Sequence, residues 1–218
     1  MERGTQMFKG KYIVLEGIEG SGKGTQATRL VQWLGDFAKV IKVREPGQTP
    51  TGLKIREILL DKNSDLATTE ELLLFFADRG MTMRGMIVPA LERGEYVVAD
   101  RSYLSTFAYQ IAGRENKGLL PLFEDLLTRV AHKIDLALVL DLPAEQGLAR
   151  VNLRQVQTGQ AIDRFEQEQI AFHERVRNGY LEGARRYATV TEVIDASVPE
   201  EAVWRQVILH VRRHMLDE

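Results

Sequence analysis

A single lysine among closely spaced glycines is the feature of this sequence that most directly indicates chemistry. The stretch "IVLEGIEGSGKGTQ" covers residues 13–26, and Lys23 lies within its glycine-rich half. The glycines are Gly17, Gly20, Gly22 and Gly24. Their Gly-x-x-x-x-Gly-Lys spacing is typical of a phosphate-binding loop, in which backbone N–H groups surround phosphate oxygens and the lysine reaches the β- and γ-phosphates. The spacing therefore predicts a nucleoside triphosphate site.

The last position of this motif departs from the common pattern. A serine or threonine usually follows the lysine and its hydroxyl binds Mg²⁺, whereas this chain has Gly24 and then Thr25. We expect magnesium to rely on Thr25, on water, or on an acidic residue elsewhere. A plain glycine-rich turn is the alternative, but the full spacing between an apolar run and an amphipathic segment at 23–37 argues against it. The form "GSGKGTQ" resembles the loop of nucleoside monophosphate kinases such as adenylate kinase.

Acidic residues end two of the apolar runs. Asp100 ends "YVVAD" and is followed by Arg101, while Asp141 ends "LALVLD". A carboxylate can hold magnesium and a guanidinium can hold a phosphate, so Asp100 and Arg101 are interpreted as metal and phosphate ligands. An ion pair between neighbours is the alternative. Asp141 precedes "LPAE" and is better interpreted as a helix cap.

Phe75 and Arg79 have the spacing of two residues on one helical face. From there an aromatic ring could stack on a base and an arginine could donate to a base carbonyl. The alternative places Phe75 in the core and pairs Arg79 with Asp78. Spacing alone leaves both interpretations open.

Arg150 and Arg154 have the same spacing in a polar segment, "AEQGLARVNLRQVQTGQAIDRFEQEQ". A mobile segment with arginines could close over phosphates and exclude water. An ordinary surface helix and loop is the alternative.

Five apolar runs provide the elements that must position these residues. They are "YIVLE" (12–16), "KVIKV" (39–43), "YVVAD" (96–100), "LALVLD" (136–141) and "TVTEVI" (189–194). Continuous hydrophobicity favours parallel strands that are covered on both faces, and the helical segments between them predict a doubly wound α/β fold. Thr68 with Glu71, and Ser197 with Glu200, match capping boxes ahead of helices at 68–93 and at the C-terminus. In such a fold, ligands bind beyond the carboxyl ends of the strands.

Composition narrows the class of protein further. The chain has 218 residues and no evident linker, so we expect a single domain over 1–218, with a loose leader at 1–9. A net charge of −2 gives no reason to expect nucleic acid or an anionic membrane as a partner. No apolar run approaches the roughly 18 residues needed to cross a bilayer. Cysteine is absent, which suits a reducing compartment, and we expect a cytoplasmic location.

The motifs taken in order resemble those of the bacterial thymidylate kinases. The set is "GIEGSGKGT", "REPGQT", "LLFFADR", "DRSYLSTFAYQ" and "DRFE", and the resemblance runs from about Lys11 to the C-terminus. It implies a P-loop kinase fold, a five-stranded parallel sheet with helices on both faces, and a short mobile lid at about residues 150–164. It also implies phosphorylation of dTMP by ATP with Mg²⁺ for dTTP synthesis, and a homodimer.

The same resemblance implies roles for individual residues. Around ATP it places Gly17, Ile18, Glu19, Gly20, Ser21, Gly22, Lys23, Gly24, Thr25, Arg150 and, near the adenine, Ser197. Around the sugar and phosphate of dTMP it places Glu19, Glu45-Pro46 and Arg101, with Arg101 at the phosphate and Tyr109 at the 2′ position of the sugar. Around the base it places Phe75 stacked on thymine, Arg79 at the thymine carbonyl, and Ser105 and Thr106 as polar contacts. Gln110 belongs to the same signature. The implied catalytic set is Lys23, Asp100, Arg101 and Arg154.

The choice of Arg154 depends on what the phosphate loop lacks. Residues 18–20 contain no arginine, which implies that the catalytic arginine comes from the lid. Three departures from the family pattern are Gln48 after Gly47, Ser102 after Arg101, and a longer lid with "QVQTG".

Three rival functions remain. A GTPase-type switch is faintly suggested by "HKID" (132–135), but that tetrad precedes an apolar run instead of following one. A kinase for another nucleoside monophosphate keeps the chemistry and changes the acceptor. A non-catalytic binding domain is disfavoured because Lys23, Asp100 and Arg101 are all present.

Overall fold

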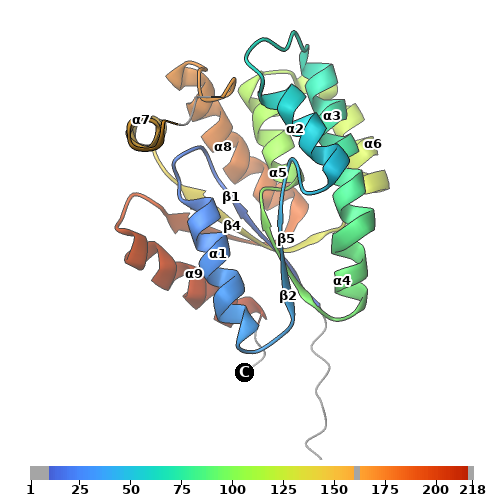
Figure 1. Ribbon diagram of the computed structural model, residues 1–218, viewed down its shortest axis with the longest axis vertical. Helices are drawn as coiled ribbons and strands as arrows, with labels where there is room; N and C mark the ends of the chain where they lie inside the picture. Colours follow the sequence, from blue (N-terminus) through green and yellow to red (C-terminus); the bar gives the residue numbers. More distant parts are fainter. Residues whose placement is uncertain (1–9, 160–162, 216–218) are drawn as a thin grey trace, which may run out of the picture.

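One parallel sheet organises the part of the chain that the structure, a computed structural model, describes: residues 10–159 and 163–215 (Figure 1). The sheet has five strands in the order β2-β3-β1-β4-β5. They are β1 (Tyr12–Glu16), β2 (Val40–Arg44), β3 (Tyr96–Asp100), β4 (Ile134–Asp141) and β5 (Ala188–Asp195). All neighbouring strands are parallel. The predicted five-stranded parallel α/β fold is therefore confirmed. The leader expected at residues 1–9 lies outside the described residues.

The central strands account for the continuous apolar runs. Every residue of β1 is buried, as are four of the five residues of β3, because helices cover both faces of the sheet. The edge strands β2 and β5 are only partly buried. This difference places the core over β3, β1 and β4.

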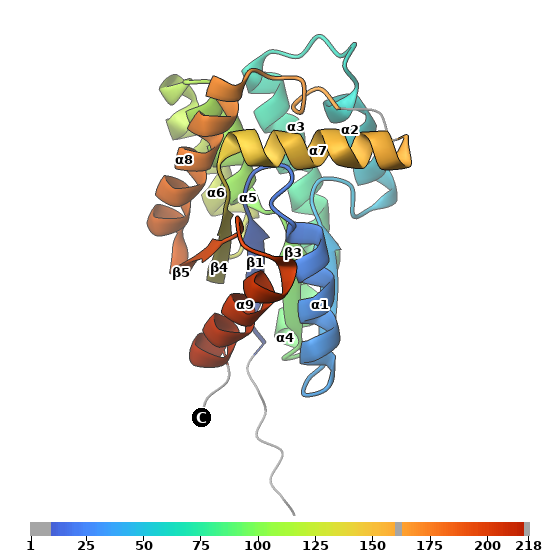
Figure 2. The ribbon, with the colours of Figure 1, turned by 90° about the vertical axis from the view of Figure 1, so that its left-hand side faces the viewer.

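Helices form a layer on each side of the sheet. On one side lie α1 (Lys23–Gly35) and α9 (Glu200–Met215). The other side carries α3 (Thr68–Thr82), a π-helical turn (Met83–Ile87), α4 (Val88–Glu92), α5 (Tyr103–Thr106), a second π-helical segment (Phe107–Gly113), α6 (Leu120–Val130) and α8 (Ile170–Tyr187). The chain also forms α2 (Pro50–Leu60) and a short 3₁₀ turn (Lys117–Leu119). Helix α7 (Ala144–Thr158) crosses above the carboxyl end of the sheet (Figure 2).

Both predicted capping boxes are wrong. Helix α3 begins at Thr68 itself and has Ala67 at its N-cap without a side-chain hydrogen bond. Glu71 is buried and accepts a hydrogen bond from Gln110 Nε2 (2.9 Å), so a tertiary partner replaces the local one. Helix α9 begins at Glu200, and Ser197 Oγ donates to Asp195 Oδ1 (2.6 Å).

Asp141 is not a helix cap either. Its two carboxylate oxygens accept hydrogen bonds from Arg177 at 2.6 and 2.8 Å, and Pro143 precedes α7 without a side-chain cap. A bidentate guanidinium contact is stronger than a capping hydrogen bond, which explains why Asp141 pairs with Arg177 and does not cap α7.

Residues 68–92 form one helical run, but with an internal π-helical turn at 83–87. This turn lies just before Pro89, which has no N–H to donate to the preceding turn. Within residues 10–159 and 163–215, no helix combines the length and the hydrophobicity needed to cross a bilayer.

Candidate active site

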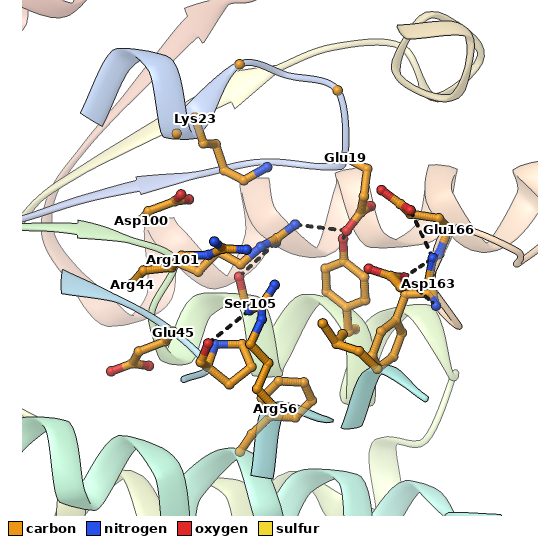
Figure 3. Close-up of a pocket in the computed structure, with 18 of the residues that line it drawn as sticks. Glu19, Lys23, Arg44, Glu45, Arg56, Asp100, Arg101, Ser105, Asp163 and Glu166 are labelled. Carbon is orange, nitrogen blue, oxygen red and sulfur yellow. Dashed lines mark hydrogen bonds and ion pairs between the residues drawn. The ribbon is translucent and has the colours of Figure 1, made fainter. Parts of the chain in front are cut away.

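A cleft of about 790 Å³ lies at the carboxyl edge of the sheet. Its wall is built from the loop between β1 and α1, the ends of β2 and β3, helices α2, α3 and α7, the second π-helical segment and residues 163–166. Figure 3 shows Lys23, Asp100 and Glu19 on one side of this space and Arg56 and Glu45 on the other. The elements predicted to carry functional residues therefore meet at one place.

The glycines of the phosphate loop adopt backbone conformations that other residues disfavour. Gly17, Gly20 and Gly22 have φ values of 141°, 76° and 87°. The loop leads directly into α1, whose N-terminal N–H groups favour an anion. Lys23 Nζ bends back and donates to Ile18 O (2.6 Å). Burial and the nearby Arg101 lower the pKa of Lys23 to about 7.

Gly24, the departure from the common motif, lies against Asp100. A Cβ atom at Gly24 would be only 3.2 Å from Asp100 Oδ2. The missing side chain therefore leaves room for a carboxylate beside the phosphate loop, where an anionic oxygen can serve a hard cation. Asp100 and the exposed Thr25 both line the cleft, so they are the side chains that fit a magnesium ion here.

Arg101 joins the phosphate loop to the opposite wall. Its guanidinium donates to Glu19 Oε1 (2.8 Å), to Ser105 Oγ (3.1 Å) and to the hydroxyl of Tyr180. Its backbone has a φ of 76°, a strained conformation for a non-glycine residue. Strain of this kind is characteristic of functional positions.

Glu19 is held by several groups at once. Tyr109 donates its hydroxyl to the same Glu19 oxygen that Arg101 contacts. Burial alone would raise the pKa of Glu19, but Arg101, His173 and Lys23 together lower that pKa well below its usual range. Glu19 is therefore a carboxylate that holds a cation and a phenol in fixed positions.

Phe75 and Arg79 differ in their access to the cleft. Phe75 is half-buried and lines the cleft while also packing on the core. Arg79 is 1% exposed and, in the described part of the chain, is not among the lining residues. It donates to Glu45 Oε2 (2.8 Å) and to Thr106 Oγ1 (3.2 Å), so the alternative pairing with Asp78 is wrong.

The segment after β2 closes one side of the cleft. The Glu45-Pro46 peptide bond is cis, and both residues line the cleft. Burial raises the pKa of Glu45, with the Arg79 guanidinium acting in the opposite direction. Gln48 Oε1 accepts from Arg44 N (2.9 Å), which gives this departure from the pattern a local role.

Helix α7 lies directly on the phosphate loop. A Cβ atom at Gly20 would be 2.3 Å from Gly147 O, so the two backbones touch. Arg150 donates to Gly20 O (3.3 Å) and to Ala196 O (3.0 Å), which ties the helix to the loop.

Arg154 extends from α7 over the cleft. Its side chain is half exposed and forms an ion pair with Glu166 (2.7 Å). The expected lid at about 150–164 includes residues 160–162, which lie outside the described residues.

The comparison with protein families can now be set beside this geometry. A family model described as "Thymidylate kinase" matches residues 15–207. The chain belongs to the thymidylate kinase family. This confirms the resemblance that the sequence motifs indicated.

Individual relatives resemble the chain over nearly its whole length. The thymidylate kinase of Desulfosudis oleivorans is 46% identical over 209 residues, covering 93% of this chain and 96% of the relative. That of Nostoc punctiforme is 41% identical, with 94% and 96% covered. The crystal structure of thymidylate kinase from Ehrlichia chaffeensis matches with a TM-score of 0.72 and 27% identity, covering 93% of this chain and 98% of that one.

The residues that the family pattern nominates do not all reach the cleft. Ser105, Tyr109 and Gln110 line it with Asp100, Arg101, Arg150, Arg154 and the loop residues Glu19, Gly20, Gly22, Lys23, Gly24 and Thr25. In the described part of the chain, the nominated loop residues Gly17, Ile18 and Ser21 do not line it. Thr106 is buried beside Arg79, and Ser197 bonds to Asp195, so in the described residues neither lines the cleft.

Sequence reasoning assigned no individual role to several lining residues. They are Arg44, Arg56, Leu60, Asp163, Phe165 and Glu166. Arg44 directly follows the apolar run at 39–43, so the rule that selected Asp100 could also have selected it. Nothing in the spacing of α2 distinguishes Arg56.

Proposed function

We propose that this protein transfers the γ-phosphoryl group of ATP to dTMP, giving ADP and dTDP, and so contributes to dTTP synthesis. The observation that carries the proposal is that Lys23 and Arg101 face one cleft and that Arg101 donates to Glu19, which belongs to the same loop as Lys23. In-line phosphoryl transfer requires that the donor and acceptor phosphates be held close together. The loop with Lys23 would hold the phosphates of ATP, and Arg101 would hold the phosphate of the acceptor. The relatives that match over most of the chain carry the name thymidylate kinase.

On the donor side, the phosphate loop would hold ATP. Backbone N–H groups from Gly17 to Thr25 would surround the β- and γ-phosphates, and Lys23 would leave Ile18 O to reach them. Asp100 and Thr25 would hold Mg²⁺ or its water shell, which neutralises charge on the phosphates when bound. Arg150, already against Gly20, would support the loop, and Ser197 would lie toward the adenine.

On the acceptor side, Arg101 would hold the dTMP phosphate and Phe75 would stack on thymine. Tyr109, fixed through its hydroxyl to Glu19, would fill the space of a 2′-hydroxyl and favour deoxyribose. Ser105 and Gln110 would complete the polar lining. Glu45 and Thr106 both contact Arg79, so a hydrogen bond from Arg79 to thymine requires its guanidinium to become accessible when dTMP binds.

Chemistry would depend on positioning more than on a base. A nucleotide phosphate is already an anion, so no strong general base is needed. Arg154 would leave Glu166 and meet the charge that spreads over the transferred group, and closure of α7 and the following lid would exclude water.

We further propose a single domain, a homodimer and a cytoplasmic location. The absence of cysteine supports a reducing compartment.

Side-by-side assays of dTMP, dUMP, UMP, CMP and AMP with ATP test this function. We expect the highest kcat/KM with dTMP. Lys23→Ala should lose most turnover while keeping dTMP affinity, and Lys62→Ala, which removes an exposed lysine, should behave like the wild type. A higher kcat/KM for another acceptor, or near-normal turnover of Lys23→Ala, would contradict the proposal.

A further inference from the structure

Two histidines and a glutamate converge on the outer edge of the sheet. Glu192 lies on the edge strand β5, and His210 and His214 lie on α9, which packs against it (Figure 1). Glu192 Oε1 is 2.6 Å from His214 Nε2, and Glu192 Oε2 is 3.1 Å from His210 Nδ1. One ligand atom from each residue lies within 4.8 Å of the other two.

Glu192 is the partner of both histidines in the described part of the chain. Each of its carboxylate oxygens faces one ring nitrogen, and the Nδ1 of His210 that takes part is buried. The three groups are therefore directed at one another, and a shared ion would take the place of these direct contacts.

We propose that Glu192, His210 and His214 form a binding site for a divalent transition-metal ion, with Zn²⁺ as the best match. Two histidines four residues apart on a helix present their rings on one face, and a carboxylate completes a His₂Glu set. Around tetrahedral zinc, ligand atoms lie about 3.3 Å apart, given metal–ligand distances of about 2.0–2.1 Å. The observed separations of 2.6 and 3.1 Å involve different oxygens of Glu192, and the ligand atoms all lie within 4.8 Å of one another, so the side chains would rearrange around the ion.

Access and selectivity also fit such an ion. The side chains of His210, His214 and Glu192 are 19%, 21% and 22% exposed, so solvent can deliver the metal and supply a fourth ligand. Imidazole nitrogens favour zinc over magnesium, which prefers an all-oxygen environment. The magnesium proposed for the reaction should therefore not compete for this site.

The role of this site is structural and not catalytic. Among the described residues, none of the three lines the active-site cleft. The ion would connect β5 to the second half of α9. The first half of α9 contacts α1 through the ion pair of Arg29 with Glu201 (2.7 Å), and α1 begins at Lys23. Zinc would thus stabilise a layer that supports the phosphate loop.

Metal titration of chelator-treated, full-length protein tests the proposal. We expect one Zn²⁺ per chain in competition with a chromophoric chelator, and a visible absorption spectrum typical of four-coordinate cobalt when Co²⁺ replaces it. Glu192→Gln, His210→Asn and His214→Asn should each weaken zinc binding on the order of tenfold or more. The matched control is His132→Asn, which removes an exposed histidine in a loop and should bind zinc like the wild type.

Thermal unfolding gives a second readout that does not depend on turnover. At a zinc concentration of about 100 times Kd, the Tm of the wild type and of His132→Asn should rise by about 5 °C or more. The three site variants should melt cooperatively without metal, which shows that they fold, and should show no such rise. Equal zinc affinity in the wild type and the site variants would overturn the proposal and leave Glu192 as an ion-pair partner of the histidines. The same conclusion follows if the wild type binds no zinc.

Discussion

Replacing Arg154 with alanine should lower kcat by about 10³ with little change in the KM of ATP or dTMP. An arginine that meets charge only in the transition state can contribute this much, which corresponds to about 4 kcal/mol. Both lid arginines line the cleft, but Arg154 is half exposed and paired with Glu166, whereas Arg150 is bonded to Gly20 O and Ala196 O.

The structure also sets the cost of bringing Arg154 into place. The side chain must first leave Glu166, 2.7 Å away. Because Arg154 is 50% exposed, that ion pair is worth less than about 1 kcal/mol, or about a fivefold effect on rate. The expected stabilisation of the transition state by Arg154 is several times larger than the cost of breaking this ion pair. Release from Glu166 therefore cancels little of the rate gain. Glu166→Gln should therefore raise kcat by no more than about fivefold.

Arg150 provides the comparison within the same helix. Its guanidinium is engaged by Gly20 O and Ala196 O, so Arg150→Ala should loosen α7 on the phosphate loop and affect the KM of ATP more than kcat. Steady-state release of ADP, measured with each substrate varied at saturation of the other, separates these effects. Normal kcat in Arg154→Ala would refute the reasoning. If Arg150→Ala is the impaired variant, the arginine was assigned to the wrong position of the lid.

Three further predictions concern the loop, the sugar and the lid helix. Because burial lowers the pKa of Lys23 to about 7 in the substrate-free protein while bound phosphates require its charged form, ATP affinity should fall above pH 7 and ATP binding at pH 8 should take up a proton. Calorimetry in two buffers of different ionisation enthalpy measures this uptake, and the same uptake in Lys23→Ala would assign the proton elsewhere. Tyr109→Ala should improve kcat/KM for UMP relative to dTMP, and an unchanged ratio would show that Tyr109 does not select the sugar. Gly147→Ala should lower both kcat and Tm, by about 2–12 °C for the latter, because the new Cβ would lie 2.6 Å from Glu19 O. Gly35→Ala, whose Cβ would meet nothing within 4 Å, is the control and should retain both.

The sheet could be predicted from sequence where burial on both faces leaves a continuous apolar run. The strands at 12–16 and 96–100 match their predicted bounds for that reason. Strand β4 begins two residues earlier than predicted, at Ile134, because Asp135 interrupts the apolar pattern. Asp135 accepts a hydrogen bond from Tyr12 N (2.8 Å), so this polar residue of β4 contacts the start of β1, 123 positions away in the sequence.

The site was predictable where a local motif carries it and not where it depends on distant contacts. The phosphate loop is a contiguous stretch, and its glycines indicate positions with positive φ. Arg56 lines the cleft from α2, where it donates to Pro46 O (2.9 Å), and its spacing in the sequence did not indicate this contact. The failed capping box at Glu71 has the same cause: Gln110 and Arg164, far along the chain, provide buried partners that outcompete the helix end.

The bridge formed by Glu19 has a consequence for how the two substrates affect each other. One carboxylate on the phosphate loop holds both Arg101 and Tyr109, the two residues proposed to contact dTMP. With ATP at this loop and dTMP at Arg101, as proposed, we expect the binding of one nucleotide to rearrange contacts that the other also uses. The two binding equilibria would then be linked by a single coupling free energy, and ATP would change the affinity for dTMP by the same factor as dTMP changes the affinity for ATP.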